Sequence, residues 1–128
     1  MDAAGLARER YISLTTFKRD GTTAATPVWV GSDDGERLLV WTGAGTWKVK
    51  RIRRDPRVRV APCDARGRPR GDAVDATARV LDDPEIAERV LRRKYRIQKP
   101  ALDLFNSLVS RLRRRPQCRS VAIEIRPS

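Results

Sequence analysis

The feature that most constrains the fold of this chain is a series of short segments in which apolar and polar residues alternate. The first three segments cover residues 11–17, 23–30 and 37–42, and an Asp-Gly pair follows each of the first two. Alternation with β-branched and aromatic residues is typical of half-buried strands, and Asp-Gly between two such segments indicates a tight turn. We therefore expect the chain to open with a three-stranded antiparallel meander.

The remainder of the chain mixes further strand patterns with helical ones. Three more strands are predicted at residues 57–62, 72–81 and 120–125, where the alternation returns. Helices are predicted at residues 47–54, 82–94 and 100–115, after one or two helical turns at residues 3–10. The last predicted helix carries an apolar stripe, formed by Leu102, Phe105, Leu108, Val109 and Leu112.

These elements define the expected fold class. Neither a repeat nor a low-complexity linker divides the 128 residues, a length typical of one domain. We expect a single domain over residues 1–128, mainly β (α+β), built as a small six-stranded antiparallel β-barrel with peripheral helices.

Positive charge is concentrated in two parts of the chain. The net charge is +12, residues 48–70 hold ten basic and two acidic residues, and residues 89–119 hold eleven basic residues and one acidic residue. Such clusters raise the local concentration of anions, whether phosphates, carboxylates or nucleic acids. Arginine-rich solvated faces are the alternative, and for residues 113–115 we prefer that interpretation.

The absence of histidine excludes several kinds of catalytic and metal site. Without His, the chain has neither a Ser-His-Asp nor a Cys-His arrangement nor a histidine-rich metal site. Cys63 and Cys118 lack the CxxC spacing of a zinc site, and we expect both to be small buried residues and not catalytic thiols. We expect no metal site, and for an enzyme we expect a bound cofactor to supply the chemistry.

The sequence carries no feature of a membrane or secreted protein. No apolar run approaches the roughly 20 residues of a membrane helix, and the first residues lack the apolar stretch of a signal peptide. We expect a cytoplasmic protein that does not insert into membranes.

Three segments that the predicted meander would bring together form a candidate phosphate site. They are TPVW at residues 26–29, WTG at 41–43 and WKVKR at 47–51. Lys48, Lys50 and Arg51 stand near the start of a predicted helix that Thr46 would cap, and charge and helix dipole both favour an anion there. The alternative is that Trp29 and Trp41 are core residues and that the lysines are solvated.

Three longer motifs carry a resemblance to a known family. They are ATPVWV at residues 25–30, WTG followed by KVKRIR within residues 41–53, and PRVRVAPCDARGRPRG at residues 56–71. In this order and spacing they resemble the pyridoxamine-phosphate-oxidase-like split β-barrel family. Within it, the chain is similar to the B branch of the deazaflavin-dependent oxidoreductases, which uses coenzyme F420. The likeness extends from Tyr11 to Ile125.

The resemblance implies a split β-barrel that forms a homodimer, with two cofactors bound at the subunit interface. It also implies that the strand at residues 26–31 lies along the ring of the cofactor and that Trp41 and Thr42 contact its chain near the phosphate. We also expect the half-open barrel to leave Val28 and Trp29 on a poorly covered face. Exposed apolar patches of this kind usually mark interfaces, so this face favours the same dimer.

The basic pair that grips the phosphate in the flavin-binding relatives corresponds here to Trp47 and Lys48. Trp47 departs from the Arg of that pattern, which argues against simple use of FMN, and Lys50 and Arg51 are the expected substitutes. The cofactor-contacting residues implied by the resemblance are Thr26, Pro27, Val28, Trp29, Trp41, Thr42, Trp47, Lys48, Lys50, Arg51, Ala61, Pro62, Cys63 and Asp64.

The function implied is hydride transfer from reduced F420 to an unsaturated small organic acceptor. F420 carries a phosphate and a polyglutamate tail, which suits the basic residues within 51–70 and 89–96. The sequence indicates no catalytic residue, because hydride transfer requires only that the deazaflavin ring of F420 be held near the acceptor. One alternative is an FMN-binding relative without F420 turnover. The other is a basic β-barrel that binds single-stranded nucleic acid, which is disfavoured because the chain has only seven aromatic residues for stacking on bases.

Overall fold

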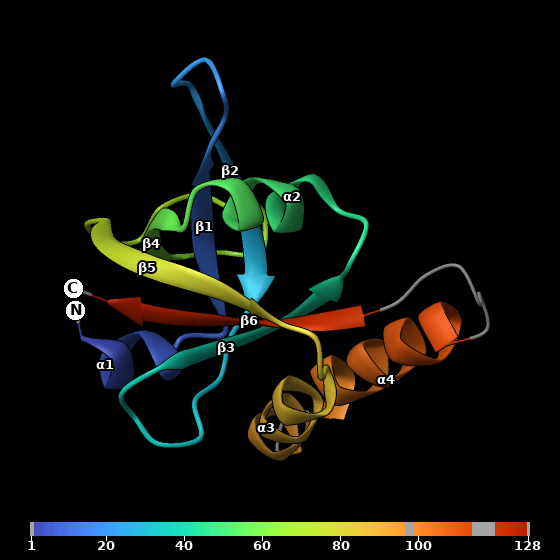
Figure 1. Cartoon of the computed structure of the whole chain (residues 1–128). Coiled ribbons are helices and arrows are strands. Elements are labelled where there is room, and N and C mark those ends of the chain that lie inside the picture. Colours follow the sequence, from blue (N-terminus) through green and yellow to red (C-terminus); the bar gives the residue numbers. More distant parts are fainter. Residues whose placement is uncertain (1, 97–98, 114–119, 128) are drawn as a thin grey trace.

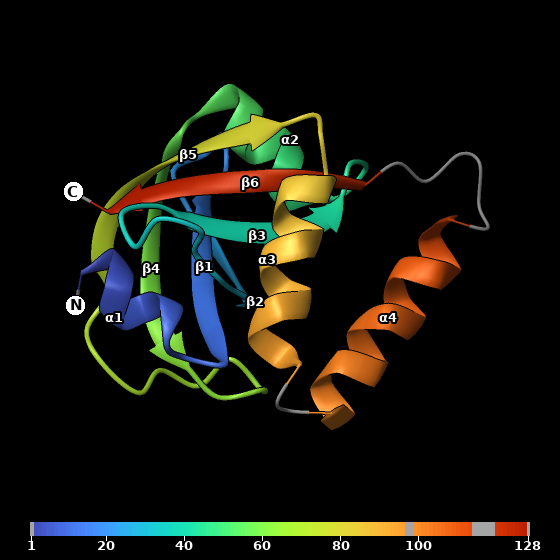
Figure 2. The same ribbon diagram turned by 90° about the horizontal axis from the view of Figure 1, so that it is seen from below.

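A six-stranded antiparallel sheet curls into a half-closed barrel, as the computed structural model of residues 2–96, 99–113 and 120–127 shows (Figures 1 and 2). Figure 1 shows α2 on one side of this sheet and α3 and α4 on the other. The elements are α1 (Ala3–Ala7), β1 (Tyr11–Phe17), β2 (Thr23–Trp29), β3 (Leu38–Gly43), α2 (Trp47–Arg54), β4 (Arg57–Cys63), β5 (Val74–Leu81), α3 (Glu85–Tyr95), α4 (Lys99–Arg113) and β6 (Ser120–Pro127). The predicted fold class is confirmed.

The order of the strands corrects the predicted meander. The sheet runs β2-β1-β4-β5-β6-β3, so β3 pairs along its whole length with β6 and not with β2. Between the two edge strands the described residues form one bridge, Gly31 with Leu39, whose N–H···O distances are 3.1 and 2.7 Å. Beyond this bridge β2 and β3 separate, and the barrel is split there.

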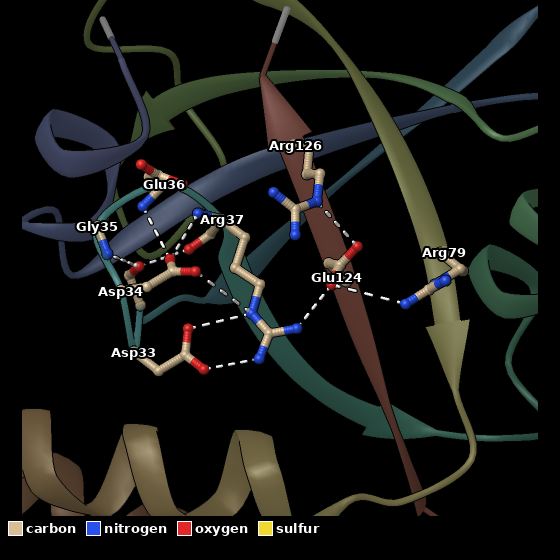
Figure 3. A network of polar contacts seen from close by, with 9 residues as sticks. Asp33, Asp34, Gly35, Glu36, Arg37, Arg79, Glu124 and Arg126 are labelled. Atoms are coloured by element: carbon tan, nitrogen blue, oxygen red, sulfur yellow. Dashed lines mark hydrogen bonds and ion pairs between the residues drawn. The ribbon is translucent and has the colours of Figure 1, made fainter.

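The connection from β2 to β3 explains why these strands do not form a hairpin. In this loop the Ser32 hydroxyl donates to the carbonyl of Arg37 at 2.5 Å, and Asp33 accepts two hydrogen bonds from the Arg37 guanidinium. Arg37 also forms an ion pair with Glu124 of β6 at 2.7 Å (Figure 3). These contacts hold the start of β3 beside β6, a partner that lies far away in the sequence.

Two apolar clusters share strand β3. Inside the barrel, Leu38 and Val40 pack with buried residues of the other strands and of α2. On the outer face, Leu39 and Trp41 pack against Leu91 of α3 and other buried residues of α3 and α4. This double burial explains the unbroken apolar run LLVW, which is typical of a strand covered on both faces.

The predicted helices are present with small shifts at their ends. The last predicted helix, 100–115, is α4, and residues 114–115 and Cys118 lie outside the described residues. In the part of the chain that the structure describes, no helix is both long and apolar enough to cross a membrane.

Candidate functional site

A cleft of about 270 Å³ lies where β2 and β3 separate. Its walls come from β1, β2, β3, α2, α3, α4 and the loop after β4. The residues that line it are Tyr11, Pro27, Val28, Trp29, Trp41, Thr42, Gly43, Lys48, Ala65, Leu91, Phe105 and Leu108. They are mainly apolar and aromatic, and Lys48 is the charged one among them, a composition typical of a cofactor or small-molecule site.

Packed aromatic rings give this cleft a rigid wall. The ring of Trp29 lies 5.5 Å from that of Phe105 and 5.6 Å from that of Tyr95, between ring centroids. Trp41 meets Phe105 edge-on, with centroids 5.6 Å apart. The indole N–H of Trp41 is buried and has no hydrogen-bond acceptor among the described residues. Trp41 is therefore both a core residue and a cleft residue, and the half-buried Trp29 lines the cleft while it packs against the same core cluster.

Lys48 supplies the positive charge of the cleft. Its side chain is half-buried, and burial lowers the pKa of its amine below the ordinary value for lysine. Within the described ranges no carboxylate forms an ion pair with it, so the ammonium is uncompensated in an apolar setting. An anionic ligand is the partner that would stabilise this charge.

The amino end of α2 adds to this preference for an anion. Thr46 occupies the N-cap position, but its side chain accepts no hydrogen bond from the helix, and its hydroxyl donates to the carbonyl of Gly43 at 2.9 Å. The prediction that the Thr46 side chain caps the helix is therefore wrong. The first-turn N–H groups beside Lys48 lack a side-chain acceptor and favour a negative charge.

The loop after β4 borders the cleft through Ala65. Asp64 accepts hydrogen bonds from the backbone N–H groups of Arg66 and Arg68, both at 2.9 Å, and these bonds hold the pKa of its carboxyl below the usual range. Gly67 has a φ of +87°, and a Cβ there would lie 3.4 Å from Pro27. The loop is thus held close against β2, and its Asp64 organises the loop itself.

The other predicted residues near this loop lie elsewhere. Ala61, Pro62 and Cys63 are buried in β4 and do not line the cleft. Burial raises the pKa of the Cys63 thiol, which makes it a poor nucleophile and agrees with its expected structural role. Thr26 is half-buried in β2 and also lies outside the lining.

Three further predicted residues lie in a separate groove on another face of α2. Trp47, Lys50 and Arg51 line it together with three basic residues, and its volume is about 400 Å³. Trp47 is 68% exposed, and the Nζ atom of Lys50 lies 4.7 Å from the centroid of its ring. We call this surface the Trp47 groove; its remaining lining residues are Lys18, Arg19 and Arg54.

The structure therefore divides the predicted site. Six predicted residues share the cleft: Pro27, Val28, Trp29, Trp41, Thr42 and Lys48. Of the other lining residues, Gly43 belongs to the predicted WTG segment and Ala65 to the motif at residues 56–71, whereas the prediction missed Tyr11, Leu91, Phe105 and Leu108. The apolar stripe of α4 indicated that Phe105 is buried, but its position beside β2 depends on tertiary packing.

The structure contradicts the exposed patch of Val28 and Trp29 on which the expected dimer was based. Val28 is only 9% exposed and Trp29 is covered by rings of α3 and α4, so neither forms an exposed patch. The exposed large apolar side chains of the described residues are Trp47, Leu104 and Leu108.

Comparison with known proteins supports the same fold. No curated protein matches the sequence. A conserved hypothetical protein of Mycobacterium tuberculosis superposes with a TM-score of 0.63 at 23% identity over 94% of this chain and 75% of the other. An F420 reductase gives 0.61 at 19% identity over 100% and 94% of the two chains. HutZ, the heme storage protein of Vibrio cholerae, gives 0.64 at 14% identity over 100% and 92%.

At these identities the solved structures establish the fold, and their different names leave the activity open. The family follows from the sequence: the family model described as pyridoxamine 5'-phosphate oxidase matches residues 2–125, which include every strand and helix of the split barrel except the last two residues of β6. The chain therefore belongs to the pyridoxamine 5'-phosphate oxidase family.

Proposed function

We propose that this protein is an oxidoreductase that binds coenzyme F420 in the cleft and reduces an unsaturated small organic acceptor. One observation carries the proposal: the uncompensated, half-buried Lys48 stands at the open amino end of α2, in a cleft walled by Trp29, Trp41 and Phe105. The cleft thus offers a flat apolar surface for a ring beside a place for a phosphate. The similarity to an F420 reductase supports this choice of cofactor.

The residues present fit such a cofactor. Lys48 and the first-turn N–H groups of α2 would bind the phosphate, and Thr42 with Gly43 would lie along the linking chain. The backbone of Val28 and Trp29, with Ala65 opposite, would hold the ring. Trp41, which lines the cleft, also has a buried indole N–H that finds no acceptor among the residues that the structure describes.

The chain contributes binding and orientation to the reaction. When bound, reduced F420 supplies a hydride. The apolar side chains of Trp29, Phe105 and Leu108 would exclude water from the face on which the acceptor lies. Their rigid packing would hold the acceptor within reach of the ring, which is the orientation effect that this reaction needs.

The Trp47 groove would receive the negatively charged tail of F420. Trp47 and Lys48 are neighbours in the first turn of α2, one in the groove and the other in the cleft. Lys50 and Arg51 form no ion pair within the described residues, whereas Arg53, Arg57 and Arg59 are each paired with an aspartate. The groove therefore has free cations for carboxylates, each contact contributing about 0.2–1 kcal/mol.

We also propose that the protein works as a cytoplasmic homodimer. Leu108, 42% exposed, lines the cleft, and Leu104, 59% exposed, lies one helical turn before it on α4. A second copy that covers this face would bury both leucines and narrow the cleft.

A second candidate function rests on the Trp47 groove alone. An exposed tryptophan among lysines and arginines is typical of proteins that bind single-stranded nucleic acid by stacking and charge.

The deciding experiment titrates the protein with F420, FMN and a fluorescent oligonucleotide under one set of conditions. F420 fluorescence that changes on binding, with weak and salt-sensitive oligonucleotide binding, supports the proposal. Tight oligonucleotide binding without any F420 response would favour the nucleic-acid function, and FMN bound more tightly than F420 would favour the FMN relative.

A further inference from the structure

A second cavity, of about 530 Å³, lies between α1, α3 and the loop that follows β2. None of its lining residues also lines the cleft. The two spaces do share α3, because Val90 lines this cavity and the next residue, Leu91, lines the cleft. We call it the α1–α3 cavity.

The floor of the α1–α3 cavity is apolar and firmly built. Ala7 of α1 and Ile86 and Val90 of α3 line it. Val90 packs directly on Gly31, where an added Cβ would lie 2.6 Å from the Val90 Cγ1 atom. Ile86 and Val90 are four residues apart on α3 and therefore share one face of the helix. This floor can accept an apolar group of a ligand of ordinary small-molecule size, since such pockets measure roughly 300–1,000 Å³.

The rim of the cavity carries positive charge that nothing in the described part of the chain neutralises. Arg8, Arg89 and Arg93 line the cavity, and none of them forms an ion pair with a described carboxylate. Arg89 and Arg93 are four residues apart, so they stand on one face of α3 like Ile86 and Val90.

The other two charged groups of the lining are already engaged. The Asp33 carboxylate accepts hydrogen bonds of 3.1 and 2.7 Å from Arg37, which turn its charge toward β3 (Figure 3). The Lys94 amine donates to the carbonyls of Glu9 and Val30, the latter at 2.6 Å, and so forms part of the wall. Three guanidinium groups are left beside an apolar floor.

We propose that the α1–α3 cavity binds a small organic carboxylate whose apolar body lies on Ala7, Ile86 and Val90 and whose carboxylate pairs with Arg89 and Arg93. Planar guanidinium groups match the two oxygens of a carboxylate, and the apolar floor selects against a bare inorganic anion. The site is independent of F420, since it shares no lining residue with the cleft.

Octanoate is the probe, and octanamide, which has the same chain without the charge, is its matched control. Methyl and amide NMR spectra of the full-length protein are recorded while each compound is added. We expect octanoate to shift the signals of Ala7, Ile86 and Val90 with saturation, and octanamide to bind about tenfold more weakly or not at all.

Two variants test whether Arg89 and Arg93 bind the carboxylate of octanoate. R89Q/R93Q should weaken octanoate binding about tenfold. R111Q, which removes an exposed arginine of α4 outside the cavity, should leave binding unchanged. Both variants change exposed side chains, and their amide spectra report whether they fold. Octanoate that shifts none of the three signals, equal binding of octanamide, or unchanged binding by R89Q/R93Q would overturn the proposal, while F420 binding in the cleft would stand unaffected.

Discussion

Replacement of Lys48 by methionine separates cofactor binding from stability. The Lys48→Met variant keeps the length and the apolar stem of the side chain but removes the ammonium at the amino end of α2. A charged hydrogen bond to a phosphate contributes about 1.5–3 kcal/mol, so the affinity for F420 should fall about tenfold to a hundredfold. The fold should not suffer, because burial already lowers the pKa of this amine and no described carboxylate stabilises its charge. We expect an unchanged or higher melting temperature.

Lys50→Met is the matched control, since it removes the same charge two residues later on the same helix. Lys50 is exposed and lies over the ring of Trp47, at 4.7 Å from its centroid. An exposed contact of this kind is worth at most about 1 kcal/mol, or roughly fivefold in affinity. The assay is a fluorescence titration of F420 with each variant, together with Arg111→Ala on α4. Equal losses for Lys48→Met and either control would show that the phosphate does not lie at Lys48.

Four other outcomes are expected. Affinity for F420 should increase with the number of glutamates in its tail and decrease with added salt. FMN has no tail, so it should bind more weakly and its affinity should depend less on salt. FMN that binds as tightly as long-tailed F420 at low salt would contradict this. Burial lowers the pKa of Lys94 to about 8 from 10.5, so the unfolded chain binds more protons between these values. The unfolding free energy should therefore rise with pH across this interval, measured by denaturant titration, and Lys94→Met should remove much of the slope. Gly31→Ala should destabilise the fold by about 1–3 kcal/mol, because its Cβ would meet the Val90 side chain, and a melting temperature equal to that of the wild type would refute this packing. Sedimentation at micromolar concentration should give a dimer whose dissociation is favoured by charged substitutions at Leu104, and a monomer alone would exclude the proposed assembly.

The secondary structure was largely predictable because its signals are local. The alternation in β1 and β4, the proline at the start of α3 and the apolar run of β3 each indicate an element from neighbouring residues alone. The pairing of β3 with β6 was not predictable in this way. It depends on contacts such as the ion pair between Arg37 and Glu124, 87 residues apart in the sequence.

The candidate site was predictable only in part, for the same reason. The motifs grouped Val28, Trp29 and Lys48, and the structure places them in one cleft because α2 begins shortly after β3 and the Gly31–Leu39 bridge holds β3 beside the end of β2. They could not show that Trp47 and Lys48, adjacent in the sequence, would face different surfaces. Helical geometry separates neighbouring side chains by about 100°, and which one enters the cleft depends on how α2 packs on the sheet.

The residues that complete the cleft come from elements whose position no local pattern reveals. Phe105 and Leu108 reach it because α4 packs beside α3, and Ala65 because the Asp64 turn holds its loop against Pro27.

The central claim is that the cleft between β2 and β3 holds F420. A crystal structure of the protein with F420 bound tests it most directly. We predict electron density for the ring between Trp29 and Ala65, with the phosphate beside Lys48 at the amino end of α2 and the tail directed toward the Trp47 groove. Density for the ring in the α1–α3 cavity, or a phosphate that contacts neither Lys48 nor the first turn of α2, would contradict the claim.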